Sequence, residues 1–180
     1  EGWKTYWHTP GEGGYSQTID WKNSSNVSFL KILWPQPQEF DILGLKSIGY
    51  ENKVIFPLRI KLENINQPSF FSFYLNYLTC KEICIPGSAY LELILPPGEG
   101  KLTNHSFQIE NYLSKIPYQD NDIAGFKIIN VAASRDANVS LIRIEAQSQL
   151  PFIDPKFFLG NDLGLPIITP QYNFSADRKN

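Results

Sequence analysis

The only two cysteines of this 180-residue chain, Cys80 and Cys84, are separated by three residues. They lie between two strand-like stretches, residues 70–79 and 89–95, so the chain must reverse its direction near them. Such a reversal can bring the two Cα atoms within the roughly 4.4–6.8 Å that a disulfide requires. The pair can therefore exist as a dithiol or as a disulfide.

Spacing alone leaves three kinds of chemistry open for this pair. A structural crosslink over so short a loop contributes about 2 kcal/mol in the chain-entropy model, against about 3 kcal/mol for a 15-residue loop. A disulfide in a turn can also be reached by an incoming thiolate, as redox exchange requires. A zinc or copper site needs further ligands, but His8 and His105 lie far away in the sequence.

The composition excludes several other functions. The formal net charge is -2 and there is no basic stripe, which argues against nucleic acid as a partner. The glycine-rich segment Gly11–Gly14 is not followed by a helical pattern, so it does not predict a phosphate-binding loop. No apolar run approaches the roughly 20 residues that span a bilayer. The chain starts at Glu1 and contains no methionine, which indicates a mature or trimmed fragment.

The hydrophobic pattern predicts a mainly β chain with one short helix. Alternation is clearest over residues 70–79, and residues 89–95 are the expected hairpin partner. The helix is predicted from Ile109 to Ile116, before Pro117, with Asn104 or Ser106 as its cap. Residues 40–44 are predicted as an apolar loop. Further strands are predicted at residues 3–7, 18–21, 27–34, 48–50, 54–60, 126–132 and 139–146, and residues 152–159 are assigned to a second β unit.

Several motifs occur in a fixed order along the first half of the chain. They are Gly2–Trp7, Pro10–Gly11, Trp34–Pro37, Gly49–Tyr50, Pro57–Ile60 and Cys80–Pro86. This order resembles the N-terminal periplasmic domain of DsbD-type protein-disulfide reductases, particularly the ScsB-like branch, over about residues 2–96. Residues 152–158 are similar, more weakly, to the second β unit of that branch.

The resemblance implies an immunoglobulin-like β-sandwich with a short helix and a second, smaller β unit. The expected divisions are residues 1–97 for the redox domain, 98–117 for a linker and helix, and 118–180 for the second β unit. The full protein would also contain a membrane-embedded electron carrier and a thioredoxin-like domain. The expected location is the periplasm, as part of an inner-membrane protein.

The resemblance also implies the chemistry. The domain would be a component of a protein-disulfide reductase that takes electrons from its sister domain and passes them to periplasmic disulfide-bonded proteins, without a cofactor or metal. Cys80 and Cys84 match the redox pair of the family. Cys84 is expected to attack the partner, because the second cysteine of the family's pair is thought to form the mixed disulfide.

A covering loop is also expected from the family. The matching stretch is Phe40, Asp41, Ile42, Leu43 and Gly44, although these side chains can also simply fill the core. Tyr6 can approach the pair as well, but an aromatic residue there more often packs in the core. Two rival functions stay open: a non-catalytic β-sandwich interaction module with a structural disulfide, and a copper-handling domain.

Overall fold

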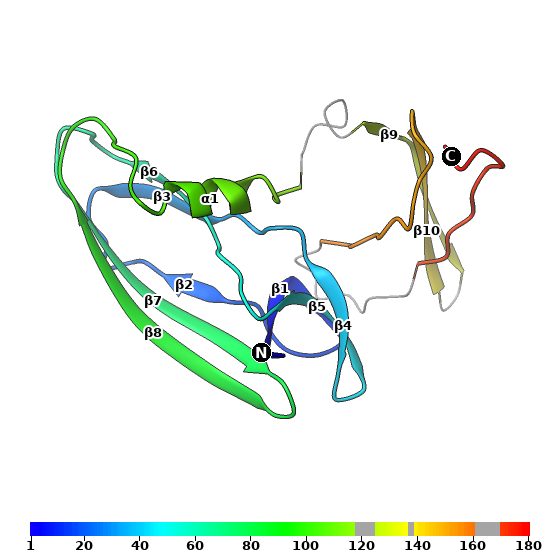
Figure 1. The fold of residues 1–180 in the computed structure, drawn as a ribbon, viewed down its shortest axis with the longest axis horizontal. Coiled ribbons are helices and arrows are strands. Elements are labelled where there is room, and N and C mark those ends of the chain that lie inside the picture. The colour runs from blue at the N-terminus through cyan, green and yellow to red at the C-terminus, as the bar shows by residue number, and fades with distance from the viewer. Residues whose placement is uncertain (118–124, 137–138, 161–169) are drawn as a thin grey trace. The chain divides into compact units, whose positions relative to one another are not determined.

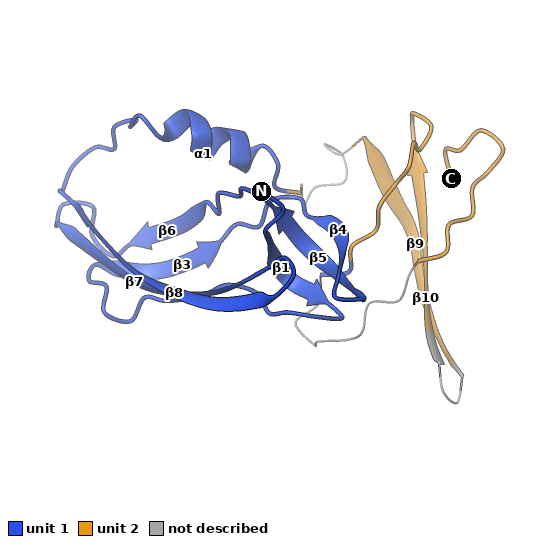
Figure 2. Ribbon diagram, turned by 60° about the horizontal axis from the view of Figure 1, so that its bottom comes forward, with its two compact units in different colours: residues 1–116, 159–167 blue, residues 117–158, 168–180 orange. Residues whose placement is uncertain are grey.

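The computed structural model describes residues 1–117, 125–136, 139–160 and 170–180. The chain divides into two compact units (Figure 2). The first comprises Glu1–Ile116 with Leu159–Ile167, and the second comprises Pro117–Phe158 with Ile168–Asn180. The boundaries expected from the sequence, at residues 97 and 117, remain a prediction.

The first unit is built from two antiparallel sheets. The larger sheet has the strand order β2-β7-β1-β5-β4, and β8 pairs with β7 as well. Its strands are β1 (Lys4–Gly11), β2 (Thr18–Asp20), β4 (Gln38–Ile42), β5 (Leu45–Glu51), β7 (Ser69–Cys80) and β8 (Cys84–Leu95). The smaller sheet pairs β3 (Val27–Ile32) with β6 (Leu58–Leu62), and Figure 1 shows it as a layer separate from the β7–β8 hairpin. The predicted mainly β, immunoglobulin-like fold is confirmed.

The longest hairpin in the first unit carries the two cysteines at its tip. Strands β7 and β8 pair along all of their residues, from Ser69 opposite Leu95 to Cys80 opposite Cys84. The predicted pairing of these segments is therefore confirmed, and β8 starts five residues earlier than the alternation indicated. The reason is that Pro86 interrupts the sequence pattern but sits on an edge strand, where a missing backbone N–H costs little.

A small buried cluster lies at the tip end of this hairpin. It contains Tyr6, Ile42, Leu78 and Cys80, with Phe40 packed against it. These side chains come from three strands that are far apart in sequence, namely β1, β4 and β7. Strand β8, in contrast, exposes most of its large apolar side chains to solvent. The core that matters for the cysteines is therefore formed by the strands on the opposite side of β7 from β8.

Two predicted segments of the first unit, residues 40–44 and 54–60, differ from the structure. Residues 40–44 are not a loop: β4 runs to Ile42, and a two-residue turn at Leu43 and Gly44 leads into β5. Both turn residues have positive φ, 53° and 80°, as tight hairpin turns require. The strand predicted from residue 54 begins only at Leu58, because Pro57 has no backbone N–H to donate to a neighbouring strand.

The helix α1 (Ser106–Leu113) is shifted towards the N-terminus relative to the prediction and falls within the first unit. Its cap position is His105, without a side-chain hydrogen bond, so neither predicted cap residue acts as the cap. The segment is held to the rest of the unit by polar contacts. Tyr112 donates a hydrogen bond to the carbonyl of Lys53, and the carbonyl of Lys115 accepts one from the N–H of Gln36.

The second unit contains one antiparallel hairpin in its described residues. Strand β9 (Phe126–Asp136) pairs with β10 (Val139–Ser148), which confirms the two predicted strands and lengthens both. Residues 152–159 form no strand, contrary to the expectation. Asp154 has a positive φ of 42°, which an extended strand does not allow. The N–H of Phe152 donates to the carbonyl of Arg178 near the C-terminus.

One glycine allows β1 and β5 to pair beside the buried cluster. Gly49 lies opposite Tyr6, and a Cβ atom at this position would lie 2.0 Å from the Thr5 carbonyl oxygen and 2.8 Å from the Tyr6 Cα. Both of these neighbours are backbone atoms, so neither can move without displacing β1. Gly49 is therefore required for the position of Tyr6.

We expect Gly49→Ala to destabilise the domain by at least about 2 kcal/mol, because overpacking against a fixed backbone forces the strands apart. Urea unfolding followed by tryptophan fluorescence measures this change in the free energy of unfolding. Gly100→Ala is the matched control, since nothing lies within 4 Å of a Cβ atom at that position. Equal stability of the two variants would contradict the close approach.

Candidate functional site: an asymmetric disulfide

The two cysteines form a disulfide at the end of the β7–β8 hairpin, with an S–S distance of 2.08 Å. Cys80 is the last residue of β7 and Cys84 is the first residue of β8, and they are directly opposite each other. The connecting turn is closed by a hydrogen bond from the N–H of Lys81 to the carbonyl of Ile83. The hairpin therefore holds the two sulfur atoms together through its backbone pairing.

The two halves of the disulfide differ sharply in exposure. Cys80 is 0% exposed and belongs to the buried cluster, whereas Cys84 is exposed. Thiol–disulfide exchange requires an attacking thiolate to reach one of the two sulfurs. Only the Cys84 side of this disulfide faces solvent. This burial pattern gives a physical reason, independent of any family, to expect attack at Cys84.

Tyr6 contacts the buried sulfur directly. Its hydroxyl donates a hydrogen bond to Cys80 Sγ at 2.9 Å and lies 3.9 Å from Cys84 Sγ. The side chain is only 1% exposed, and this burial raises the pKa of the Tyr6 phenol above its usual value. The hydroxyl therefore stays protonated, and able to donate, at neutral pH. The sequence placed Tyr6 near the pair but gave no sign of this contact.

Strand pairing explains how Tyr6 reaches the sulfur. Lys4 of β1 lies opposite Cys80 and Thr5 lies opposite Thr79, so the two strands run side by side at the disulfide. The Thr5 hydroxyl also donates to the carbonyl of Leu78 at 2.9 Å. Side chains alternate between the two faces of β1, so the residue two positions after Lys4 shares the face of Lys4 and of Cys80 opposite it. The aromatic residue on that face is Tyr6.

The five residues expected to form a covering loop separate into two groups. Phe40 and Ile42 face the cluster: Ile42 is 5% exposed, and the Phe40 and Tyr6 ring centroids are 6.1 Å apart. Asp41, Leu43 and Gly44 are exposed. Alternation on β4 separates Asp41 from Phe40 and Ile42, because successive side chains of a strand point to opposite faces. Leu43 and Gly44 lie in the turn that follows β4. Ile42 belongs to the same buried cluster as Cys80, and Phe40 packs against that cluster.

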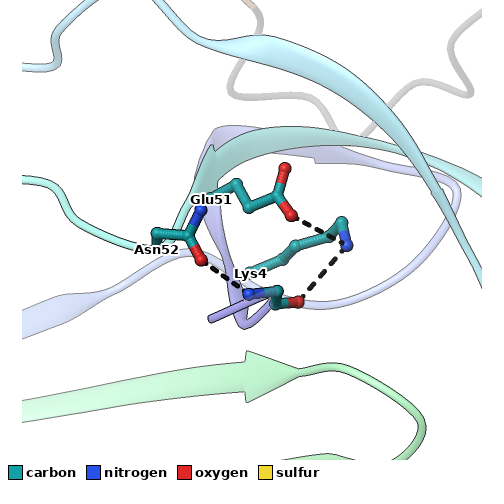
Figure 3. A network of polar contacts seen from close by, with 4 residues as sticks. Lys4, Glu51 and Asn52 are labelled. Carbon is teal, nitrogen blue, oxygen red and sulfur yellow. Dashed lines mark hydrogen bonds and ion pairs between the residues drawn. The ribbon is translucent and has the colours of Figure 1, made fainter.

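A polar network that includes Lys4, Glu51 and Asn52 fixes the start of β1 (Figure 3). Lys4 Nζ lies 3.7 Å from the Glu51 carboxylate and donates to the carbonyl of Gly2 at 3.4 Å. The N–H of Gly2 donates to the Asn52 side chain at 2.6 Å. Lys4 Nζ also lies 5.7 Å from the Phe40 ring centroid, within the range of a cation–π contact. This network connects β1, β5 and β4 at the edge of the site.

Residues 1–96 match the family model described as thiol:disulfide interchange protein DsbD, N-terminal. This match covers more than half of the chain. The chain belongs to the DsbD N-terminal family. Family membership and the Cys80–Cys84 disulfide together identify a thiol–disulfide exchange domain, as the resemblance in the sequence implied.

This DsbD-family chain is also similar to a solved structure, the N-terminal periplasmic domain of ScsB from Proteus mirabilis. The TM-score is 0.68 at 27% sequence identity. The match covers 91% of this chain and 61% of the ScsB chain, so it extends beyond the residues of the family model. No curated protein matches the sequence.

Other site types find no support in the residues that the structure describes. Within these residues, no group of three or more His, Cys, Asp or Glu side chains is arranged to hold a metal ion. The His8 ring lies against the Trp7 ring, with centroids 3.8 Å apart. Nor does any helix in the described ranges have the length and apolar character needed to cross a membrane.

We expect the reduced domain to react with iodoacetamide at Cys84 at least about tenfold faster than at Cys80, because reaction needs an accessible thiolate. Peptide mass spectrometry after short labelling times measures the two rates. In urea-unfolded protein the rates should converge. Similar rates at the two cysteines in the folded protein would contradict the asymmetric site.

Proposed function

We propose that this domain relays electrons in the periplasm, as a component of a protein-disulfide reductase that is part of an inner-membrane protein. A thioredoxin-like domain, itself reduced by a membrane-embedded domain, reduces the Cys80–Cys84 disulfide. The resulting dithiol then reduces disulfides in periplasmic partner proteins. The observation that carries this proposal is the disulfide between Cys84, which is exposed, and Cys80, which is buried.

The exchange proceeds in two displacements. A thiolate of the reduced donor attacks Cys84 Sγ, and the electron pair of the S–S bond moves to Cys80 Sγ. A mixed disulfide now joins the donor to Cys84. The second thiolate of the donor attacks its own half of this mixed disulfide and releases Cys84. The donor is oxidised by two electrons, and the domain holds two thiols that reduce the next protein by the reverse steps.

The rival proposal is a purely structural disulfide. The loop between the cysteines contains three residues, and a crosslink over so short a loop restricts the unfolded chain little. Backbone pairing already fixes β7 against β8 over their whole length. An exposed sulfur is also a weakness in a structural crosslink, because thiols in solution can reduce it. A reduction potential well below about −300 mV would nevertheless favour the structural role.

The exchange proposal predicts that only one single-cysteine variant traps a partner. We expect Cys80→Ser to accumulate a mixed disulfide between Cys84 and a thioredoxin-like protein whose resolving cysteine is replaced by serine and whose attacking cysteine carries a thionitrobenzoate leaving group. Cys84 displaces the thionitrobenzoate, and neither protein then keeps a second thiol to resolve the complex. Cys84→Ser should accumulate far less, since Cys80 is buried. Non-reducing electrophoresis measures both complexes. Trapping through Cys84→Ser alone, or through neither variant, would contradict the assignment.

We further propose that Phe40 and Ile42 act as a one-sided cover. They pack on the Cys80 side and leave Cys84 open, so they direct incoming thiols to Cys84. The Lys4 contact with the Phe40 ring holds this cover in place. The cover therefore shields Cys80 alone and does not shield both cysteines.

Phe40→Ala should expose Cys80 and raise severalfold the share of glutathione adduct formed on that sulfur. Brief reaction of the oxidised domain with glutathione, acid quenching and peptide mass spectrometry measure the adducts on each cysteine. Phe29→Ala is the matched control, because Phe29 is 45% exposed on β3 and does not belong to the cluster. Adducts confined to Cys84 in both variants would exclude a covering role for Phe40.

A further inference from the structure

The glycine-rich segment that follows β1 has no role in the functions considered so far. Within it, Gly14 has a φ of +86°, and a Cβ atom there would lie 2.2 Å from Cζ of Tyr6. Cζ is the ring carbon that carries the hydroxyl. The Tyr6 ring therefore lies directly against the backbone of residue 14, at a distance that only glycine permits.

The same segment is attached to the strand that follows the cover. The N–H of Glu12 donates to the carbonyl of Lys46 at 2.9 Å, and its carboxylate accepts from the N–H of Lys46 at 2.8 Å. A Cβ atom at Gly13 would lie 2.8 Å from the end of the Leu45 side chain. Residues 12–14 are thus held on the first residues of β5, and we call them the glycine seat.

The Tyr6 ring is confined on several sides by these contacts. Gly14 lies against the hydroxyl end, Gly49 lies against its backbone, and Phe40 packs beside the ring. The hydroxyl has its hydrogen bond to Cys80 Sγ already formed in the disulfide state. A side chain so restricted needs little reorganisation when charge develops on the sulfur.

We propose that Tyr6 is a catalytic residue of the exchange, donating its hydrogen bond to Cys80 Sγ as the S–S bond breaks, and that Gly14 positions it. This inference rests on the proposed exchange at Cys84. When a donor thiolate forms its bond to Cys84 Sγ, the electron pair of the broken S–S bond resides on Cys80 Sγ. The Tyr6 hydroxyl donates to this thiolate and keeps its own proton. Solvent supplies the proton that later neutralises Cys80.

The buried position of Cys80 makes this donor necessary. A thiolate formed out of contact with water carries a large desolvation cost unless a hydrogen bond compensates it. Hydrogen bonds to charged groups are roughly twice as strong as those between neutral groups, so the bond strengthens as the charge develops. A better leaving sulfur also speeds exchange. Tyr6 and the cover together make Cys84 the attacked sulfur and Cys80 the leaving one.

Tyr6→Phe tests the hydroxyl. We expect the second-order rate constant for reduction by dithiothreitol to fall about tenfold, equal to about 1.4 kcal/mol in activation free energy. A tenfold fall in the equilibrium constant would also lower the reduction potential by about 30 mV. Tyr90→Phe is the control: it removes a hydroxyl bonded to Ser72, on the same hairpin but away from the disulfide. Unchanged rate and potential in Tyr6→Phe would overturn the proposal.

Gly14→Ala tests the seat. It should slow reduction by dithiothreitol about as much as Tyr6→Phe, and the double variant should be no slower than Tyr6→Phe alone, because the two changes remove one interaction. Gly98→Ala is the control for backbone strain, since its φ is +115° and nothing lies within 4 Å of the added Cβ. Full additivity, or a wild-type rate in Gly14→Ala, would refute the positioning role.

Two further measurements keep these outcomes distinct. If Gly14→Ala fails to fold, Gly13→Ala replaces it, because its Cβ would lie 2.8 Å from Leu45 Cδ1 and 3.4 Å from Leu45 Cβ, so the glycine seat must shift against β5. A wild-type rate in that variant would count against the seat. Dithiothreitol needs no protein docking, so the role of Tyr6 is tested separately from the relay. A wild-type domain that reacts with dithiothreitol, together with a Cys80→Ser variant that traps no protein, would refute the relay alone.

Discussion

The hydrogen bond from Tyr6 to the buried Cys80 sulfur is the contact on which the site depends. It exists because β1 pairs with β7 at the disulfide and because two glycines leave room for the Tyr6 backbone and ring. Burial raises the pKa of the phenol, which keeps the donor in its protonated form. The same burial removes Cys80 from solvent. One packing arrangement therefore provides a protected sulfur with a hydrogen-bond donor, beside an exposed sulfur that a partner can reach.

The hairpin that carries the disulfide serves two structural purposes at once. Its β7 strand pairs with β8, β1 and β2 and supplies Leu78 and Cys80 to the cluster. Its β8 strand is largely exposed, so Cys84 at the start of β8 is on the accessible side. Moving from the last residue of one strand to the first residue of the next thus crosses from core to surface. Two cysteines that are separated by only three residues can therefore differ in solvent exposure. This difference does not require a charged side chain between them and the core.

The likeness to the ScsB domain extends over most of this chain. The structural match covers 91% of this chain, whereas the family model covers residues 1–96, so the likeness includes parts of the chain beyond the redox hairpin. The chain spans 61% of the length of the ScsB chain. The proposed chemistry needs only residues of the first unit, from β1, β4, β5, β7, β8 and the glycine seat. The second unit contributes one antiparallel hairpin in its described residues.

The sequence alone determined the hairpin that carries the two cysteines and the mainly β class, since alternation, turn residues and cysteine spacing are local signals. The redox role of the pair followed only from the resemblance to the family. The sequence also placed Phe40 and Ile42 near the pair, but only through the order of family motifs. The sequence pattern does not predict that Phe40 and Ile42 face the cluster while Asp41 is exposed, because it indicates a loop at residues 40–44. Only the tertiary structure decided that Cys80 is buried, that Tyr6 donates to it and that Gly14 confines the ring. Each of these depends on pairing between strands more than 60 residues apart or on contact across a loop, and no local pattern encodes such distances.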